Sequence, residues 1–136
     1  MLFLIEAFQK ACQAAIAEGV EVATSEGMKK FSLTLPDQLN LIDLRKRLDG
    51  CVGDMNCCTI PYHADGEPMR LWSGNDIQKI LQSADDHVMH HRVYYNLLRE
   101  WVRRTSYPEF LRIDYGDALP DDLARTMAAI LGSGAD

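Results

Sequence analysis

One long stretch of the chain carries an unbroken helical pattern of apolar residues. Between Ser73 and Thr105, apolar side chains recur at the spacing of a helix that buries one face. Ser73 followed by Asp76 is typical of a helix start, because the Ser73 hydroxyl can accept from a free backbone N–H of the first turn. We therefore predict a nearly continuous spine helix over residues 73–105. Its buried face is predicted to carry Ile77, Ile80, Leu81, Ala84, Val88, His91, Tyr95, Leu98 and Val102.

The first part of the chain predicts a helix followed by a hairpin. Residues 5–18 have a helical pattern, and Gly19 is suited to end that helix. Two β-prone runs then flank Gly27, which can supply the positive φ of a tight hairpin. The apolar face of the helix is predicted to hold Ile5, Phe8, Cys12, Ala15 and Ile16.

A second helix and a second hairpin are predicted next. Thr34 with Asp37 repeats the helix-start pattern, and the helix is expected to stop near Gly50. A loop then leads to a hairpin centred on Asp65-Gly66, a dipeptide favoured in hairpin turns. The predicted apolar positions of the helix are Leu39, Ile42, Leu44 and Leu48.

The segment after the spine helix predicts a short helical turn and a last helix. Ser106 and Glu109 repeat the helix-start pattern, and Pro120 is suited to begin the last helix. Residues 1–4 and 132–136 are expected to fray. The prediction is thus an α+β fold in a single domain, 1–136, that is mainly helical with two small β-hairpins. The last helix is predicted to carry Leu123, Met127, Ile130 and Leu131.

Composition and charge narrow the classes of partner. Hydrophobic residues make up 47% and charged residues 25% of 136 residues, with a net charge of −6. A negative charge disfavours nucleic acid and anionic membranes, because both attract basic surfaces. The opening MLFLIEAFQK lacks the basic start of a signal peptide, and Glu6 ends its apolar run. We therefore expect a soluble protein made inside a cell.

The cysteines show no metal-binding pattern. Cys12, Cys51, Cys57 and Cys58 include no C-x-x-C pair. Without a secretion signal, a reduced state is the default expectation. Metal ligation or redox use of Cys57–Cys58 is the less favoured alternative, because the paired spacings of zinc sites are missing.

Several segments, read in order, resemble a known family. They are FSLTLPDQLNL, IPYHADGEPMRLWSGNDI, DDHVMHHRVYYNLL and IDYGDALPDDLA, and the similarity extends from about Gln9 to Ile130. The chain resembles an uncharacterised domain of tailed-bacteriophage and prophage proteins, often encoded near tail-fibre and minor structural genes. The resemblance implies a setting in phage tail biology. It implies no reaction, because the family has no established activity.

The histidines are the candidates for a metal site. His87 and His91 are four residues apart, so one helix face can present both imidazoles, and His63 is a possible third ligand. The resemblance implies that these positions recur together. The segment between His87 and His91 lacks the glutamate that serves as general base in zinc proteases. We therefore predict structural histidines and no bound metal.

Two pairs of acidic residues are candidates for general acid–base catalysis. Asp85 and Asp86 lie beside His87, but consecutive residues on a helix point in different directions. Asp65 and Glu67 fall in the predicted hairpin turn, where acidic residues usually serve the turn itself. No nucleophile elbow or phosphate-binding loop accompanies either pair. The prediction is that the chain has no catalytic residues and no cofactor.

The end of the long helix combines aromatic rings with guanidinium groups. Arg, Trp and Tyr supply most hot spots of protein–protein interfaces, so Arg99, Trp101, Arg103 and Arg104 are the candidate interaction residues. The alternatives are stacking on single-stranded nucleic acid, or a core role for Trp101 with the arginines capping the helix. An acidic segment folded back onto the arginines would disfavour nucleic acid. Its residues are Asp114, Asp117, Asp121 and Asp122.

The sequence and the resemblance together favour a non-enzymatic phage or prophage protein of the tail region. It is expected to be a virion component or assembly factor that acts by associating with a tail or tail-fibre protein or with itself. It would be found in the host cytoplasm during synthesis and, if it is a virion component, also in the virion tail. The alternatives are a phage-encoded small-ligand-binding or counter-defence protein, and a metal-dependent enzyme that uses the cluster of His63, His87 and His91.

Overall fold

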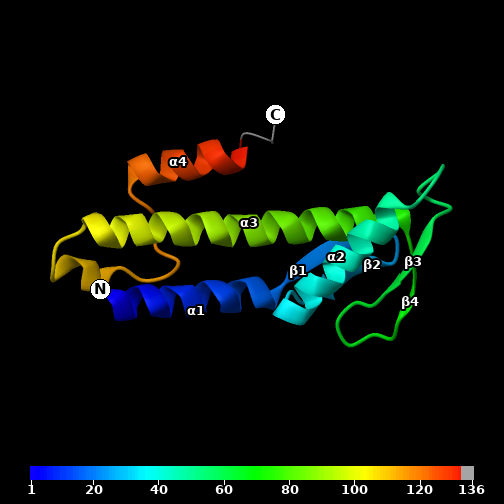
Figure 1. Ribbon diagram of the computed structural model, residues 1–136, viewed down its shortest axis with the longest axis horizontal. Helices are drawn as coiled ribbons and strands as arrows, with labels where there is room; N and C mark the ends of the chain where they lie inside the picture. The colour runs from blue at the N-terminus through cyan, green and yellow to red at the C-terminus, as the bar shows by residue number, and fades with distance from the viewer. Residues whose placement is uncertain (133–136) are drawn as a thin grey trace. The chain divides into compact units, whose positions relative to one another are not determined.

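The computed structural model describes residues 1–132 and confirms the α+β fold (Figure 1). The contacts within the chain form two compact units. Unit 1 comprises Met1–Ala15 and the chain from Val88 onward, and unit 2 comprises Ile16–His87. The elements are α1 (Leu2–Glu18), β1 (Val20–Thr24), β2 (Gly27–Phe31), α2 (Leu35–Asp49), β3 (Thr59–Tyr62), β4 (Arg70–Ser73), α3 (Gly74–Arg104), the 3-10 helix η1 (Glu109–Arg112) and α4 (Asp121–Gly132).

The predicted spine helix is α3. Its bounds differ from the prediction by one residue at each end, and the Ser73 hydroxyl accepts from the Asp76 N–H at 3.2 Å as expected. The Asp76 carboxylate, however, binds the backbone N–H and the hydroxyl of Ser25 in the turn between β1 and β2. Along the predicted stripe Val88, His91 and Tyr95 are half-buried. The fully buried positions are Ile77, Ile80, Leu81, Ala84, Leu98 and Val102.

The first hairpin forms where the sequence predicts it. Strands β1 and β2 pair antiparallel from Val20–Phe31 to Thr24–Gly27, and Gly27 has a φ of +100°. Gly19 ends α1 with a φ of +84°. A Cβ atom at Gly19 would lie 2.0 Å from the Phe31 carbonyl oxygen, so only glycine allows the chain to pass this close.

The second hairpin forms with a wider turn than Asp65-Gly66 predicts. Strands β3 and β4 pair antiparallel, and the last pair is Tyr62 with Arg70. The loop between them stays open because Asp65 binds the first hairpin. Its carboxylate accepts from the Ser32 N–H at 2.9 Å and from the Ser32 hydroxyl, and its own N–H donates to the Lys30 carbonyl at 2.8 Å.

Helix α2 begins as predicted, but only part of its predicted apolar face is buried: Leu44 is buried and Leu48 is half-buried. The Thr34 hydroxyl accepts from the Asp37 N–H while the Asp37 carboxylate accepts from the Thr34 N–H, which is the expected capping box. The buried residues are Leu41 and Leu44. The predicted core positions Leu39 and Ile42 are wrong, because the side of α2 that carries them is not covered and they stay 68% and 54% exposed.

Three aromatic rings form the centre of unit 2. Phe31 stacks on Tyr62 with ring centroids 6.0 Å apart and meets Trp72 edge-on at 5.7 Å. The indole N–H of Trp72 donates to the Tyr62 carbonyl at 2.9 Å, and the Arg70 guanidinium lies 3.5 Å above the Trp72 ring. All three rings are less than 9% exposed, so they fix β2 against the second hairpin.

Unit 1 packs the start of α1 and the end of α3 around one apolar cluster. The buried members are Phe8, Leu98, Val102, Phe110 and Ile113. Residues 2–4, which are predicted to fray, belong to α1, and the Met1 carbonyl accepts from the N–H groups of Leu4 and Ile5. Partial burial of Leu4 and Ile5 against the cluster stabilises this first turn.

The end of unit 1 follows the prediction in outline. Helix α4 begins after Pro120 and buries Leu123. The predicted helical turn is η1, but no side chain caps it, so Ser106 contributes only its carbonyl, which accepts from the Phe110 N–H. Of the predicted frayed residues 132–136, Gly132 belongs to α4 and 133–136 lie outside the described residues.

The segment between α2 and β3 contains a disulfide that the sequence did not predict. Cys51 and Cys58 are bonded to each other, with Cα atoms 6.0 Å apart, whereas a reduced state was expected. The structure brings the two residues together through the turn that the intervening residues form. Cys12 and Cys57 have free thiols.

Candidate functional site

The predicted interaction residues at the end of α3 occupy different environments. Trp101 is half-buried and packs against the apolar cluster of unit 1. The Arg99 guanidinium lies 5.5 Å from the Tyr95 ring, and its buried Nε has no hydrogen-bond partner within residues 1–132. Arg103 is exposed. Trp101 is therefore partly a core residue, as one of the alternatives predicts. Arg103 is directly accessible to a partner.

Arg104 is held by the acidic segment that follows α3. Its two terminal nitrogens donate to the two carboxylate oxygens of Asp122 at 2.5 and 2.7 Å. This bond lowers the pKa of Asp122 to about 2 and raises the pKa of Arg104. The acidic segment thus folds back onto one of the four predicted arginine and aromatic residues, which reduces the positive charge at this end of α3.

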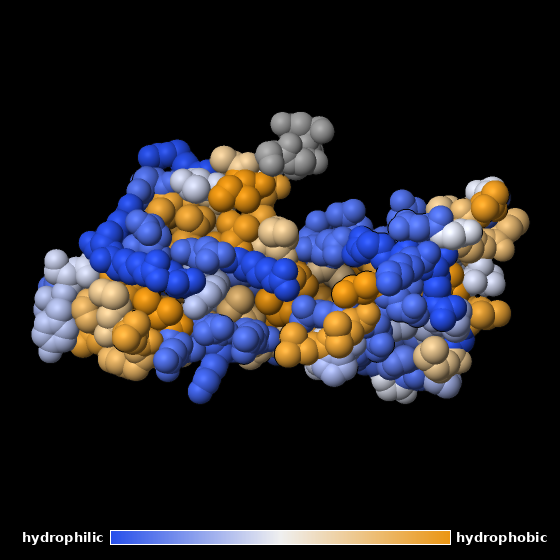
Figure 2. Space-filling view, viewed as in Figure 1, coloured by the Kyte–Doolittle hydropathy of each residue, from blue (hydrophilic) through white to orange (hydrophobic). Residues whose placement is uncertain are grey.

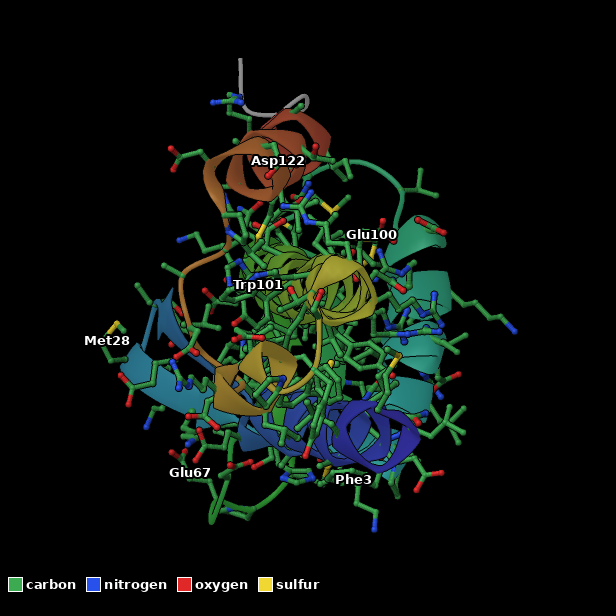
Figure 3. All side chains as sticks on the ribbon, turned by 90° about the vertical axis from the view of Figure 1, so that its left-hand side faces the viewer. Phe3, Met28, Glu67, Glu100, Trp101 and Asp122 are labelled. Atoms are coloured by element: carbon green, nitrogen blue, oxygen red, sulfur yellow. A yellow bond between two sulfur atoms is a disulfide. The ribbon has the colours of Figure 1, made fainter. Side chains whose placement is uncertain are left out.

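Large apolar side chains that were not predicted as interaction residues are exposed at the same end of unit 1. Leu2 and Phe3 at the start of α1 are 77% and 66% exposed, and Tyr107 and Leu111 beside and within η1 are 74% and 45% exposed. The start of α1 lies beside η1 in both Figure 1 and Figure 3, and both pack on the cluster around Phe110. We call Leu2, Phe3, Tyr107 and Leu111 the apolar end.

The apolar end is visible on the surface of unit 1. Figure 2 shows apolar side chains gathered over the start of α1, and Figure 3 views the same end head-on with Phe3 on α1 and Trp101 on α3 labelled. The signal in the sequence is the apolar run MLFLI, of which residues 1–4 are predicted to fray and Ile5 is predicted to lie on the apolar face of the first helix. The exposure of this run together with Tyr107 and Leu111 depends on the fold, so the run alone does not predict it.

The histidines make local contacts. The Nδ1 atom of His63 lies 3.1 Å from the Ala64 carbonyl, and the Nδ1 atom of His91 lies 2.9 Å from the Tyr115 hydroxyl. The His91 ring also stacks on Tyr115. Over residues 1–132, no group of three or more His, Cys, Asp or Glu side chains is placed to hold a metal ion. The arrangement gives the metal-dependent alternative no support.

The four acidic residues of the two pairs each bind a separate partner. Asp85 accepts from Arg45 of α2 at 2.9 and 3.0 Å, and Asp86 accepts from Gln82 one turn away at 2.9 Å. Asp65 binds Ser32, and Glu67 pairs with Lys29 of β2 at 2.9 Å. Each pair is split between separate partners, so neither forms a carboxylate dyad.

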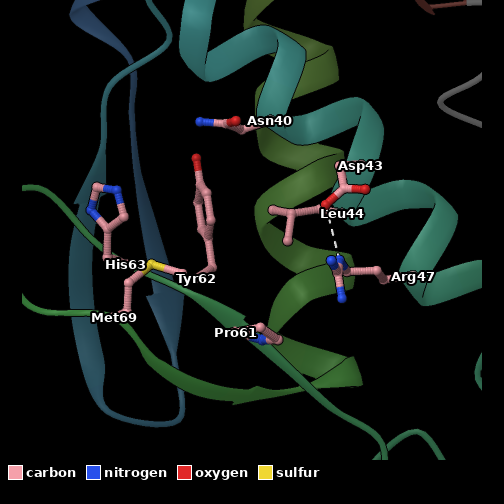
Figure 4. Close-up of a pocket in the computed structure, with 8 residues that line it drawn as sticks. All are labelled: Asn40, Asp43, Leu44, Arg47, Pro61, Tyr62, His63 and Met69. Carbon is pink, nitrogen blue, oxygen red and sulfur yellow. Dashed lines mark hydrogen bonds and ion pairs between the residues drawn. The ribbon is translucent and has the colours of Figure 1, made fainter.

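A pocket of about 220 Å³ lies in unit 2 between α2 and the second hairpin. Figure 4 shows the Tyr62 ring standing in it with its hydroxyl directed toward Asn40, and the Asp43–Arg47 ion pair of 2.9 Å at its side. Of the residues that line this pocket, only His63 was predicted from the sequence as a candidate functional residue. The lining comprises Asn40, Asp43, Leu44, Arg47, Pro61, Tyr62, His63 and Met69.

The polar groups in this pocket are suited to hydrogen bonding with a neutral ligand. Burial, followed by the charges of Asp37 and Asp65, raises the pKa of Tyr62 to about 12, so its phenol is a donor at neutral pH. Among residues 1–132, no side chain hydrogen-bonds to the Tyr62 hydroxyl or to the Asn40 amide. The contact of His63 Nδ1 with a carbonyl leaves Nε2 as the acceptor of that ring.

Two further findings complete the description. Of the helices over residues 1–132, none is both long enough and apolar enough to cross a membrane. Comparison with protein-family models, with curated proteins and with solved structures finds no match to this chain.

Proposed function

We propose that this chain is a non-enzymatic phage or prophage protein of the tail region that works by associating with other protein. The observation that carries the proposal is the apolar end, where four large apolar side chains are 45–77% exposed at one end of unit 1. Exposed apolar residues that gather on one surface are typical of protein–protein contacts. The tail setting rests on the resemblance of the segments from FSLTLPDQLNL to IDYGDALPDDLA.

The surroundings of the apolar end favour protein over nucleic acid as the partner. Arg104 is neutralised by Asp122, and two further acidic residues are exposed: Glu100, four residues before Arg104, and Asp121, next to Asp122. Arg103 remains exposed as a polar residue of the kind found at interface rims. A surface with large apolar residues and mixed charge suits a copy of the chain or a tail protein, because symmetric tail parts are built from repeated contacts.

Association is expected to fail when the apolar end is made polar. We expect Phe3→Ser/Tyr107→Ser to weaken self-association or binding to tail proteins about 10-fold or more, as loss of two large contact residues does at interfaces. Light scattering over a concentration series measures self-association. Binding to tail proteins is measured by their retention from particle-producing cells on the tagged chain. Val52→Ser is the matched control, because Val52 is 96% exposed but belongs to unit 2.

The outcome that contradicts the proposal is equal association by wild type, the double variant and the control. A strictly monomeric wild type that also retains no tail protein contradicts it as well. Circular dichroism of each variant establishes that the fold is kept, which is expected because both altered side chains are at least 66% exposed.

The pocket in unit 2 favours a second candidate function, the binding of a small neutral ligand. Its polar groups include the Tyr62 hydroxyl, the Asn40 amide and the His63 ring beside the mutually paired Asp43 and Arg47, and its apolar wall includes Leu44 and Met69. Such a combination suits a flat, uncharged molecule that both donates and accepts hydrogen bonds, such as a nucleobase or an aromatic amide.

Binding in the pocket is expected to depend on the Tyr62 hydroxyl. With adenine, uracil and nicotinamide as probes, amide NMR shifts should be confined to residues near Asn40, Leu44 and His63, and Tyr62→Phe should weaken binding about 5-fold or more. Tyr107→Phe, an exposed tyrosine of unit 1, is the control. Absence of shifts with all three probes, or binding unchanged in Tyr62→Phe, rules this candidate out.

A further inference from the structure

Three cysteines lie within the segment 51–58, and their environments differ. Cys51 and Cys58 are half-buried and joined as a disulfide, while Cys57 is exposed with a free thiol. The fourth, Cys12, is buried in unit 1, where its thiol donates to the His91 carbonyl at 3.4 Å. Burial raises the pKa of the Cys12 thiol, which lowers its reactivity.

Bonds that do not involve sulfur shape the segment between the paired cysteines. The Cys57 N–H donates to the Asp54 carbonyl at 3.0 Å, and the Asn56 N–H donates to the Asp54 carboxylate at 2.9 Å. The Cys51 N–H donates to the Leu48 carbonyl at the end of α2. These bonds shape the turn that brings Cys51 and Cys58 together, so the loop between them is short and already partly ordered.

The same segment is attached to the first residues of α3. The Gly74 N–H donates to the Met55 carbonyl at 3.0 Å and to the Cys58 carbonyl at 2.8 Å, and the Asn75 amide donates to the Asn56 side chain. A Cβ atom at Gly74 would lie 2.8 Å from the Met55 carbonyl oxygen, so the contact is close. The redox state of the segment is therefore linked to the start of α3.

We propose that Cys51 and Cys58 are a redox-active pair that reacts reversibly with low-molecular-weight disulfides of the glutathione class. One cysteine thiolate attacks a sulfur of the external disulfide, whose S–S bond breaks and releases one thiolate that takes up a proton. The second cysteine thiolate then attacks the protein sulfur of the mixed disulfide and releases the other small thiol. Two protein thiols become one disulfide, and the external disulfide is reduced to two thiols.

Oxidation closes the segment and stabilises its contact with α3, whereas reduction loosens it. The second cysteine of the pair is Cys58, whose carbonyl is one of the two acceptors for Gly74, so the cross-link restrains an acceptor directly. Cys57 is not needed for this effect. It is the natural control, because it lies next to Cys58 in the same turn and makes no disulfide.

The pairing is tested on the full chain equilibrated with mixtures of reduced and oxidised glutathione and then trapped by alkylation. Cleavage before Asp54 separates Cys51 from the other two cysteines, so only a disulfide that includes Cys51 keeps the fragments together in mass spectrometry. Cys57→Ser should form this disulfide as wild type does, and Cys51→Ser and Cys58→Ser should not. Cys57→Ser chains that stay fully reduced in every mixture, or a pairing that requires Cys57, overturn the proposal.

The link to α3 is tested by hydrogen exchange in oxidised and reduced wild type, which needs no variant. Reduction is expected to speed exchange of the Gly74 amide about 10-fold and to lower the melting temperature by about 5 °C, the effect typical of opening a short disulfide loop. Amides of α4 in unit 1 serve as the internal control and should not change. Equal exchange at Gly74 in both states overturns the link.

Discussion

Leu98→Ala is expected to lower the free energy of unfolding of unit 1 by about 2–5 kcal/mol, the cost of a large-to-small change in a packed core. Leu98 is 0% exposed and belongs to the cluster formed with Phe8, Val102, Phe110 and Ile113. That cluster joins α1, α3 and η1, so a cavity there weakens the support of the apolar end as well. Urea unfolding followed by circular dichroism measures the loss.

The matched control for this change is Met89→Ala on the same helix. Met89 is 50% exposed, and its truncation is expected to cost less than about 0.5 kcal/mol, as is usual at the surface. If Leu98→Ala also costs less than about 0.5 kcal/mol, Leu98 is not in the core and the buried face of α3 is assigned wrongly.

Asp76→Ala is expected to lower the stability of unit 2 by about 3 kcal/mol, the order of loss when a buried carboxylate with two hydrogen bonds is removed. Asp76 is 3% exposed, and its carboxylate accepts from the Ser25 N–H at 3.0 Å and from the Ser25 hydroxyl at 2.5 Å. The change leaves both donors of Ser25 without their acceptor and removes a negative charge from the first turn of α3.

Asp86→Ala is the control for this second change, because Asp86 is exposed on the same helix and accepts from Gln82 one turn away. Its expected cost is less than about 0.5 kcal/mol. Asp76→Asn keeps one acceptor oxygen and is expected to fall between the two. Equal stabilities of Asp76→Ala and Asp86→Ala, measured by urea unfolding, contradict the role given to the Ser25–Asp76 contact.

Local signals in the sequence predicted most of the fold. The capping box of Thr34 and Asp37 and the positive φ of Gly19 and Gly27 depend on neighbouring residues only, and all are found. The long apolar stripe of α3 was confirmed towards both ends, because its repeat extends over many turns, but its middle positions Val88, His91 and Tyr95 are only half-buried. These features need no knowledge of distant contacts.

The features that were missed depend on residues far apart in the sequence. The open loop of the second hairpin results from the contact of Asp65 with Ser32, and the start of α3 is tied to Ser25, a contact across 51 positions. The exposure of Leu39 and Ile42 depends on which side of α2 meets β3. No periodicity in the sequence contains this information.

The candidate site likewise contains some residues that the sequence predicts and some features that only the fold reveals. The sequence named Arg99, Trp101, Arg103 and Arg104 from composition and spacing, and these remain predicted interaction residues. The apolar end requires the start of α1 to lie beside η1, which follows only from the packing of unit 1 around Phe110. The pocket likewise combines α2 with a loop that the sequence assigned to a tight turn.

Radical footprinting of the apolar end is the most direct test of association. The side chains of Phe3, Tyr107 and Leu111 would be labelled in the isolated chain and in assemblies recovered from particle-producing cells, with Val52 of unit 2 as the reference. The account predicts that labelling of these three falls about 5-fold or more on assembly, as expected for residues at the centre of an interface, while Val52 is unchanged. Equal labelling of the apolar end in the isolated and assembled chain would contradict the account.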